Sequence, residues 1–282
     1  MRAIGSTFAA LLLAGTAFAW TAAASPIVAG FDTNIFLAND DGTYPANGMG
    51  SGTPPGTPVA QPLGFGFNFY GTTYSSVFVN NNGNVTFNAA QATFTPPAIV
   101  DPTGNPLLAP FFADVDTRSG PLVTFGTGLL GGQAAFGVNW LGVGYYSQNT
   151  DLTNSFQLLL VDRSDIAAGD ADIYFNYGSM QWETGDASGG AGGLGGTCAH
   201  VGFNNGTGVS YEVPGSGVCG ALIDGGGDEL RSASNHGVPG QFLFEVRGGT
   251  IDAPEPASLA LLGAGLLGLA GLRRCERARV GS

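Results

Sequence analysis

The chain contains no lysine, and charged residues make up only 11% of its 282 positions. Nine arginines oppose 21 acidic residues, so the formal net charge is −12. Between residues 25 and 252 the imbalance is larger, because four arginines there oppose 19 acidic residues, a net charge of −15. Nucleic acid and anionic lipid repel a body with this charge, since both are negatively charged themselves. We therefore exclude nucleic acid as a partner.

Histidine is also scarce, and His200 and His236 are the only two imidazoles. The chain has no Gly-x-Ser-x-Gly nucleophile motif and no Cys-x-x-Cys pair. Carboxylate pairs are plentiful, but a sequence does not place two of them across a cleft. Two Gly-x-Gly-x-x-Gly matches, at 126–131 and 263–268, do not open a helix after a strand, so they predict no phosphate site. We expect a protein that is not an enzyme, with a hydrolase as the remaining alternative.

Glycine is abundant, with 48 residues, and no part of the body shows sustained helical periodicity. Phe65, Phe67 and Phe69 alternate with small or polar residues, as in a half-buried strand. Gly142 and Gly144 interrupt another strand and predict a bulge or bend there. Other strand patterns cover 74–79, 84–87, 122–125, 134–146, 155–162, 171–182, 200–203, 209–213 and 242–246. Between the first two, Asn80–Gly83 predicts a hairpin turn, because Asn and Gly tolerate positive φ. We predict an all-β fold, a β-sandwich or related barrel of about 9–12 mostly antiparallel strands.

Residues 106–120 look like the centre of this fold. An apolar run from Leu107 to Ala113 ends abruptly at Asp114 and Asp116, which Arg118 and a Ser-Gly turn follow. Clustered carboxylates suit a hard cation, so Asp114 and Asp116 are candidate Ca²⁺ ligands. The alternative is an ion pair of either aspartate with Arg118, combined with capping of the turn. No other cofactor is indicated.

Three further groups of side chains are candidate binding sites. Asp170 with Asp172, and Asp224 with Asp228 and Glu229, are weaker cation candidates, and none of them fits a known Ca²⁺ loop. An aromatic set offers a platform for stacking sugars, although aromatic residues in strands more often belong to the core. Its members are Trp140, Tyr145, Tyr146 and Trp182.

The N-terminus has the pattern of a secretory signal peptide over residues 1–24: Arg2, an apolar run, and small-residue cleavage sites after Ala24 or Ala19. A membrane anchor is the alternative, but the run is short for that purpose.

In an oxidising compartment Cys198 and Cys219 are expected to form a disulfide, with two buried thiols as the alternative. Cys275 lies beyond them in the tail.

The C-terminus has three parts. Pro254-Glu255-Pro256 ends a linker over 251–256, and an apolar run over 257–272 follows it, which predicts a transmembrane helix. Sixteen residues span roughly 24 Å as a helix, slightly less than a bilayer core, and the flanking arginines can snorkel. A basic tail, 273–282, begins with Arg273 and Arg274 and is expected on the cytoplasmic side. A buried core helix, the alternative, would not carry four arginines directly after it.

This tail resembles the PEP-CTERM sorting signal of Gram-negative bacteria. The resemblance implies that an exosortase recognises Pro254, Glu255 and Pro256, with Arg273 and Arg274 as the basic cluster, and cleaves nearby. It also implies a biofilm or exopolysaccharide setting. Residues 275–282 extend past the usual end of the signal. The chain would be exported through the inner membrane, held by the C-terminal helix transiently or permanently, and delivered to the cell surface or the extracellular matrix.

The body resembles the NIDO (nidogen-like) domain of extracellular matrix proteins. The motifs that carry the resemblance occur in order within residues 105–248. These residues belong to a β domain predicted over 61–250, and an irregular arm over 25–60 precedes that domain. They are 108–118 (LAPFFADVDTR), 138–146 (VNWLGVGYY), 154–158 (NSFQL), 172–177 (DIYFNY), 181–185 (QWETG), 202–206 (GFNNG) and 244–246 (FEV). The resemblance implies a structural or cell–matrix adhesion role, with polysaccharide or a matrix protein as the partner. The alternative is a lectin-like carbohydrate-binding module, assisted by calcium.

Overall fold

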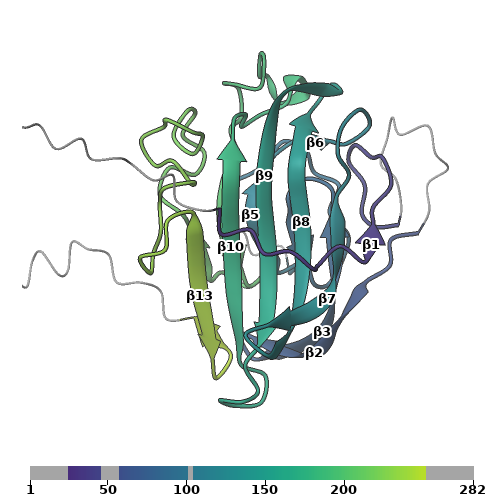
Figure 1. Ribbon diagram of the computed structural model, residues 1–282, viewed down its shortest axis with the longest axis vertical. Coiled ribbons are helices and arrows are strands. Elements are labelled where there is room, and N and C mark those ends of the chain that lie inside the picture. The colour runs from purple at the N-terminus through teal and green to yellow at the C-terminus, as the bar shows by residue number, and fades with distance from the viewer. Residues whose placement is uncertain (1–24, 46–56, 101–103, 252–282) are drawn as a thin grey trace, which may run out of the picture.

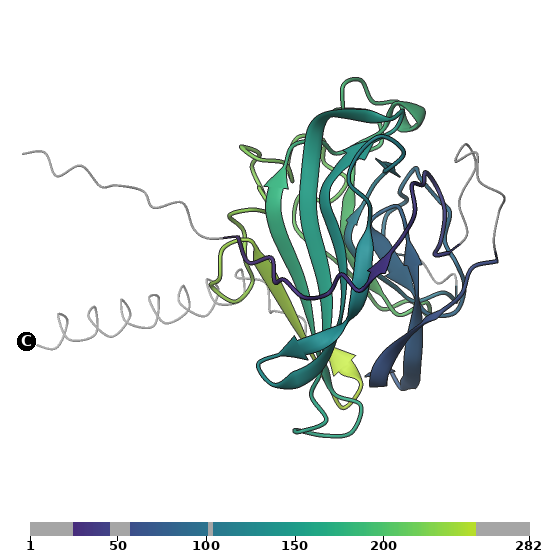
Figure 2. The same ribbon diagram turned by 45° about the vertical axis from the view of Figure 1, so that its right-hand side comes forward.

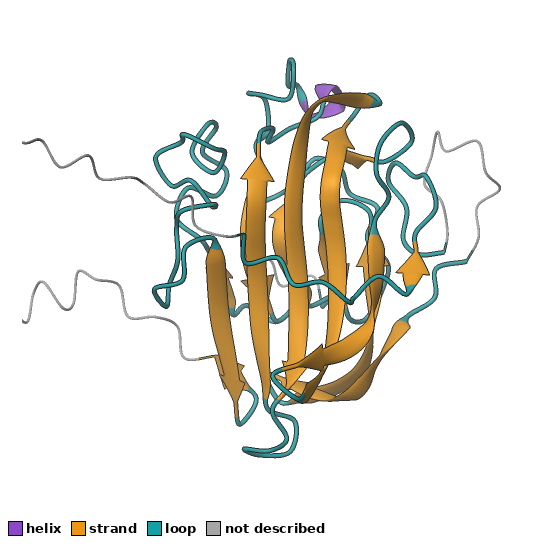
Figure 3. Ribbon diagram, viewed as in Figure 1, coloured by secondary structure: helices purple, strands orange, loops and turns teal. Residues whose placement is uncertain are grey.

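The computed structural model describes residues 25–45, 57–100 and 104–251. These residues form strands and a single 3-10 turn, η1 (Asp186–Ser188), so the predicted all-β class is confirmed (Figure 3). No helix among them is long and apolar enough to cross a membrane. The signal peptide predicted over 1–24 and the transmembrane helix predicted over 257–272 lie outside the described residues.

The strands form two antiparallel sheets that pack face to face (Figures 1 and 2). The larger sheet follows the order β1 (Asn34–Ile35), β7 (Thr124–Leu130), β8 (Gln133–Tyr145), β9 (Asn149–Asp162), β10 (Ala171–Met180), β13 (Gln241–Arg247) and β14 (Thr250–Ile251), and β6 (Val115–Asp116) also pairs with β8. The smaller sheet follows the order β12 (Ser210–Glu212), β11 (His200–Asn204), β5 (Leu107–Phe112), β4 (Asn84–Thr86), β3 (Thr72–Asn80) and β2 (Gln61–Phe69).

The described part of the chain therefore contains fourteen strands, where the sequence predicted about 9–12. The prediction was low because β1, β6 and β14 have two residues each, too few to show alternation. The predicted bulge in β8 is confirmed: its register with β9 shifts on both sides of Val143, and Gly142 has a φ of +69°. Positive φ at this point is the reason for glycine.

The core lies between the two sheets, where the inward faces of their central strands bury aromatic and branched side chains. Phe156 of β9 stacks on Trp140 of β8, with ring centroids 5.1 Å apart, and contacts Phe111 of β5 across the interface. Each of these three side chains is at most 1% exposed. Fully burying one such ring contributes roughly 1.5–3 kcal/mol, so contacts of this kind hold the two sheets together.

The N-terminal segment crosses the outer face of the larger sheet, over β10, β9 and β8, before it reaches β1 (Figure 1). Phe31 packs there against Leu159 and Val161, which makes β9 buried on both faces. A half-exposed sheet would alternate apolar and polar residues, whereas a strand covered on both sides reads as a continuous apolar run. This cover explains the unbroken sequence Leu-Leu-Leu-Val at 158–161.

A row of amide side chains attaches this segment to the sheet. The row runs across four neighbouring strands, whose amide-bearing residues are paired in register: Asn139, Gln157, Asn176 and Gln241. The Gln157 amide donates to Asn139 Oδ1 (2.7 Å) and to the Val28 carbonyl (2.6 Å), and its Oε1 accepts from Val28 N (3.0 Å). Asn139 in turn donates to the Phe31 carbonyl (2.7 Å). Satisfied amides of this kind fix strand register as well as the path of the segment above them.

The stretch 106–120 connects the two sheets. β5 lies in the middle of the smaller sheet between β4 and β11, and two residues later β6 pairs with β8 of the larger sheet, Val115 opposite Tyr145. The chain therefore changes sheets at Ala113 and Asp114. The backbone there is held by hydrogen bonds from Val115 N to the Ala113 carbonyl (3.0 Å) and from Tyr146 N to the Asp114 carbonyl (3.2 Å).

Candidate functional site

Three carboxylates meet where the chain changes sheets. They belong to Asp40, Asp41 and Asp114, and one oxygen from each lies within 4.8 Å of the other two. We call this group the carboxylate cluster. Asp114 is 1% exposed and Asp40 is 3% exposed, whereas Asp41 is only partly buried. Sequence analysis placed Asp114 with Asp116 and gave no signal that Asp40 and Asp41 are its neighbours.

Hydrogen bonds from two directions hold the loop that carries Asp40 and Asp41. Asn39 forms two hydrogen bonds with Thr117, just after β6: Thr117 N donates to the Asn39 carbonyl (2.9 Å), and Asn39 N donates to the Thr117 side-chain Oγ1 (2.9 Å). Gly42 closes the loop by donating its N–H to Asn39 Oδ1 (2.6 Å). These hydrogen bonds within the protein therefore position the loop against the larger sheet.

The turn between β3 and β4 forms the floor beside the cluster. The sequence predicted a hairpin turn at Asn80–Gly83, and the antiparallel pair Asn80–Asn84 confirms it. The turn is buried, and its asparagine side chains hydrogen-bond to the chain around the cluster. Asn82 donates to Asp41 Oδ1 (3.0 Å) and accepts from Val115 N (3.0 Å), while Asn81 donates to the Val115 carbonyl.

Several buried oxygens at this place have no hydrogen-bond partner within the described residues. They are both carboxylate oxygens of Asp114, Oδ1 of Asp40 and Oδ1 of Asn81. Buried polar atoms in native proteins are nearly always satisfied, so a group of unsatisfied acceptors requires an explanation. Gly185 closes the cluster from another side, because a Cβ at that position would lie 2.3 Å from Asp114 Oδ2.

Burial governs the electrostatics of the cluster. Burial, with the neighbouring carboxylates of Asp41, Asp40 and Asp116, raises the pKa of Asp114 to about 8, and Arg118 opposes the shift. Burial also raises the pKa of Asp40 to about 7, with Asp41 and Asp116 adding to the effect and Arg118 opposing it. The pKa of Asp41 is raised by burial too. Carboxyl groups with such values require a proton or a cation close by at neutral pH.

Asp116 has a different role from Asp114. Its Oδ1 accepts from the N–H of Arg118 (3.0 Å) and from the Nε of the same residue (2.9 Å), and its Oδ2 is paired with Arg118 Nη2 and accepts from Gln148 N (2.8 Å). Arg118 also reaches Asp40 Oδ2 (3.0 Å) and lies over the ring of Tyr146. The ion pair with turn capping, the alternative given above, thus describes Asp116. Four carboxyl groups, those of Asp40, Asp41, Asp114 and Asp116, thus lie near one arginine side chain.

The other acidic candidates do not form a comparable cluster, although Oδ1 of Asp224 is also buried without a hydrogen-bond partner within the described residues. Asp172 pairs with Arg163 (2.7 Å) and Arg247 (2.6 Å), and Asp170 Oδ1 accepts from Gly248 N (2.8 Å). Asp224 Oδ2 is near Ser179 (3.3 Å) and Arg231 (3.9 Å). No described group of three potential metal ligands includes any of these residues, nor Asp228 or Glu229.

The aromatic platform for sugars was wrong. Trp140, Tyr145 and Trp182 are at most 1% exposed, so they form core contacts, and only Tyr146 is partly exposed. Trp140 Nε1 donates to the Asn81 carbonyl (2.9 Å) and Trp182 Nε1 to the Val143 carbonyl (3.0 Å), which satisfies both indoles inside the protein. The physical reason is that the two sheets pack face to face, and these aromatic side chains fill the space between them.

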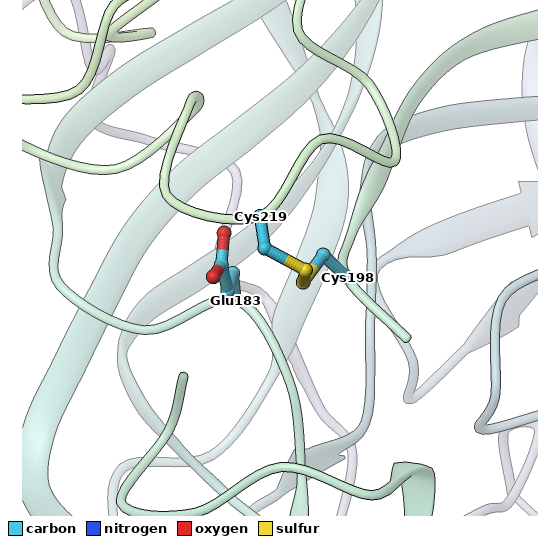
Figure 4. Close-up of side chains that lie close together, drawn as sticks. All are labelled: Glu183, Cys198 and Cys219. Carbon is cyan, nitrogen blue, oxygen red and sulfur yellow. A yellow bond between two sulfur atoms is a disulfide. The ribbon is translucent and has the colours of Figure 1, made fainter. Parts of the chain in front are cut away.

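The structure links Cys198 and Cys219 by a disulfide, with Cα atoms 5.3 Å apart, as predicted from export (Figure 4). In the loop-entropy description, closing 21 residues contributes about 3 kcal/mol. Glu183 lies beside the bond and accepts from Gly220 N (2.6 Å), next to Cys219. Both sulfurs are used in the disulfide, so this group offers no thiolate to a metal; Glu183 instead fixes the loop that the bridge closes.

A scan against protein families gives two matches. Residues 38–217, well over half of the chain, match the NIDO-related family. The chain belongs to the NIDO-related family. The matched span begins at residue 38, so it includes the loop with Asp40 and Asp41 as well as Asp114. Residues 252–274 match the PEP-CTERM protein-sorting motif, which indicates a surface or secreted protein. Pro254, Glu255, Pro256, Arg273 and Arg274 lie outside the described residues.

Relatives of this NIDO-related chain are found among much longer proteins. Alpha-tectorin of Homo sapiens is 32% identical over 209 residues, which cover 65% of this chain and 9% of alpha-tectorin. Alpha-tectorin of Gallus gallus is 31% identical over 223 residues, 70% of this chain and 10% of the relative. Nidogen of Drosophila melanogaster is 28% identical over 217 residues, 67% of this chain and 14% of nidogen. The chain spans a small part of these relatives, and no solved structure matches it.

The two histidines of the NIDO-related chain have ordinary structural contacts. His200 Nδ1 lies 2.7 Å from Glu212 Oε1, which also accepts from Ile99 N (2.7 Å). His236 is exposed; its Nδ1 is 3.4 Å from Ser234 Oγ in the same turn, and its Nε2 contacts the amide of Gln241 rather than a carboxylate. A catalytic triad requires an orienting carboxylate on the imidazole that activates the serine. The Ser234–His236 contact does not have one.

Proposed function

We propose that this protein is an extracellular structural or cell–matrix adhesion protein, exported and then processed by an exosortase at its C-terminal signal. The NIDO-related domain binds polysaccharide or a matrix protein without covalent chemistry, and it is not an enzyme. The sorting signal determines where the domain is delivered. The proposed setting is the exopolysaccharide matrix at the surface of the producing cell.

One observation carries this proposal: the sorting motif directly follows the last strand of the sandwich. β14 ends at Ile251, and the matched motif begins at residue 252. Cleavage near Pro254–Pro256 would therefore release a β domain that has lost none of its described strands. An architecture in which the removable segment begins where the fold ends suits a protein that is delivered by its tail and functions without it.

The structural or adhesive role is preferred to the carbohydrate-binding alternative because of where the aromatic residues lie. Sugar sites depend on exposed rings, whereas Trp140 and Trp182 are fully buried here. The outward-facing side chains of the domain are largely loop residues, and loops on a rigid scaffold commonly carry binding functions. The domain thus presents its loops and sheet edges, rather than a stacking platform, to a partner.

Replacement of the three motif residues tests the sorting part of the proposal. In the native host, the triple variant Pro254→Ala, Glu255→Ala, Pro256→Ala is expected to accumulate uncleaved in the membrane fraction, whereas the wild-type domain is recovered outside the cell. An exosortase cannot process a chain that lacks its recognition motif. Fractionation followed by immunoblotting measures the ratio, which we expect to change at least tenfold.

The matched control for this experiment is Glu245→Ala in β13, an exposed acid in the same domain that leaves the motif intact. It should be released like wild type. Release of the triple variant at the wild-type level would contradict the proposal.

A further inference from the structure

We propose that Asp40, Asp41 and Asp114 form a Ca²⁺ site that fastens the N-terminal loop to the point where the chain changes sheets. This site differs from the sequence expectation, which paired Asp114 with Asp116. It is also independent of the sorting signal, because all three ligands belong to the folded domain.

The unsatisfied oxygens are the first argument. Asp114 is 1% exposed, and neither of its carboxylate oxygens has a hydrogen-bond partner within the described residues, although one of them is within 4.8 Å of ligand atoms from Asp40 and Asp41. A buried carboxylate without any donor costs several kcal/mol unless a cation compensates it. Oδ1 of Asp40 is unsatisfied in the same way. These acceptors are therefore available to a ligand that supplies only positive charge.

The spacing is the second argument. Ca²⁺ takes six to eight oxygens at about 2.3–2.6 Å, so oxygens on opposite sides of the ion are about 4.6–5.2 Å apart. The three carboxylates each place an oxygen within 4.8 Å of the other two, which is close enough for all three to bind one such ion. Asn81, on the hairpin turn that also binds Asp41 through Asn82, has a further buried oxygen without a partner. Carboxylate and amide oxygens are hard ligands, which favours Ca²⁺ over softer metals.

The local charge is the third argument. Arg118 is the cation next to the cluster, and its single charge is shared between both oxygens of Asp116 and Oδ2 of Asp40. A divalent cation would add positive charge to this group of carboxyl groups, of which Asp41 is partly exposed.

The consequence of such a site follows from where its ligands lie. Asp40 and Asp41 belong to the loop after β1, and Asp114 to the link between β5 and β6. Bound Ca²⁺ would connect the N-terminal loop to the junction of the two sheets, and would do so only where Ca²⁺ is plentiful, as it is outside the cell. Affinities of extracellular Ca²⁺ modules are commonly about 10⁻⁴–10⁻³ M, and we expect a value near this range.

Calorimetric titration of the full-length chain, stripped with chelator and then titrated with CaCl₂, tests the proposal. We expect one Ca²⁺ per chain and a thermal midpoint that rises with Ca²⁺ concentration, since a ligand that binds only the folded state stabilises it. Absence of binding and of any midpoint shift up to about 10 mM Ca²⁺, well above the expected range, would overturn the proposal. An equal response to Mg²⁺ would overturn the assignment to Ca²⁺.

Two variants locate the site, and a third is the control. Asp114→Asn is expected to weaken Ca²⁺ binding at least tenfold, yet to be no less stable than wild type in chelator, because it removes a buried charge and keeps the volume. A merely structural aspartate would show the opposite, lower stability in chelator. Asp41→Asn, at a partly exposed position, should also weaken binding and is not expected to impair folding.

Asp165→Asn serves as the control, because it removes the same charge from an exposed position in the loop between β9 and β10, at the opposite end of the sheet. It should bind Ca²⁺ like wild type. Wild-type affinity in both Asp114→Asn and Asp41→Asn would place the ion elsewhere and overturn the proposal.

Discussion

Gly83→Ala is expected to prevent folding, or to lower the free energy of unfolding by more than about 4 kcal/mol, the range of exceptional single substitutions. Gly83 ends the buried hairpin turn between β3 and β4, and a Cβ there would lie 1.7 Å from the carbonyl oxygen of Phe111. That contact is with backbone of the central strand β5, which also donates from Phe111 N to the Gly83 carbonyl (3.2 Å). Neither side can move without breaking the join between turn and strand.

The measurement is denaturant unfolding followed by the fluorescence of the buried tryptophans. Gly131→Ala is the matched control, because Gly131 also has a positive φ (+60°) but a Cβ there meets nothing within 4 Å. It should cost about 1–2 kcal/mol, the ordinary penalty of a left-handed residue with a side chain. Equal costs for the two variants would show that the turn does not pack on β5 as described.

Gln157→Leu is expected to lower the free energy of unfolding by roughly 3 kcal/mol or more. Leucine has a similar size but leaves the Asn139 and Asn176 side chains and both backbone groups of Val28 without their partner. Each buried group that loses its partner costs about 1–3 kcal/mol. The segment should also loosen around Val28, because both of the backbone groups of Val28 bind Gln157.

Denaturant unfolding measures the first effect, and the rate of proteolysis within 25–33 measures the second. Gln181→Leu is the control: the side chain is exposed, and its oxygen accepts one bond, from Thr153 N (2.9 Å). It should cost less than about 1.5 kcal/mol, the usual worth of one hydrogen bond. If Gln157→Leu costs no more than this, the amide row does not hold the segment.

The strands could be predicted because each long strand carries its own local pattern. Phe65, Phe67 and Phe69 alternate, and β2 (Gln61–Phe69) buries Phe67 and Phe69 while Phe65 packs at the edge of the core. The asparagine-glycine turn and the glycine bulge in β8 depend on backbone conformations that few other residues adopt. Such features depend on residues that are neighbours in the chain, so they can be predicted from the sequence alone.

The carboxylate cluster could not be predicted for the opposite reason. Asp40 and Asp114 are far apart in the chain, and the loop that brings them together is positioned by Asn39 and Thr117, neither of which has a recognisable motif. The aromatic platform failed because Trp140, Tyr145 and Trp182 belong to the core between the two sheets, and a local pattern does not show which side of a strand faces the other sheet. The N-terminal segment that covers the outer face of β9 was not predictable either, because no local pattern in β9 identifies what lies above it.

Intact mass spectrometry of the protein released by its native host tests the central claim, that this NIDO-related domain is exported and cut from its tail. The account predicts one species that begins near Ser25 and ends near Pro254–Pro256. It should be about 2 Da lighter than its reduced sequence, the mass of two hydrogens lost at Cys198–Cys219. A full-length chain that keeps its C-terminus in the membrane would contradict processing by an exosortase.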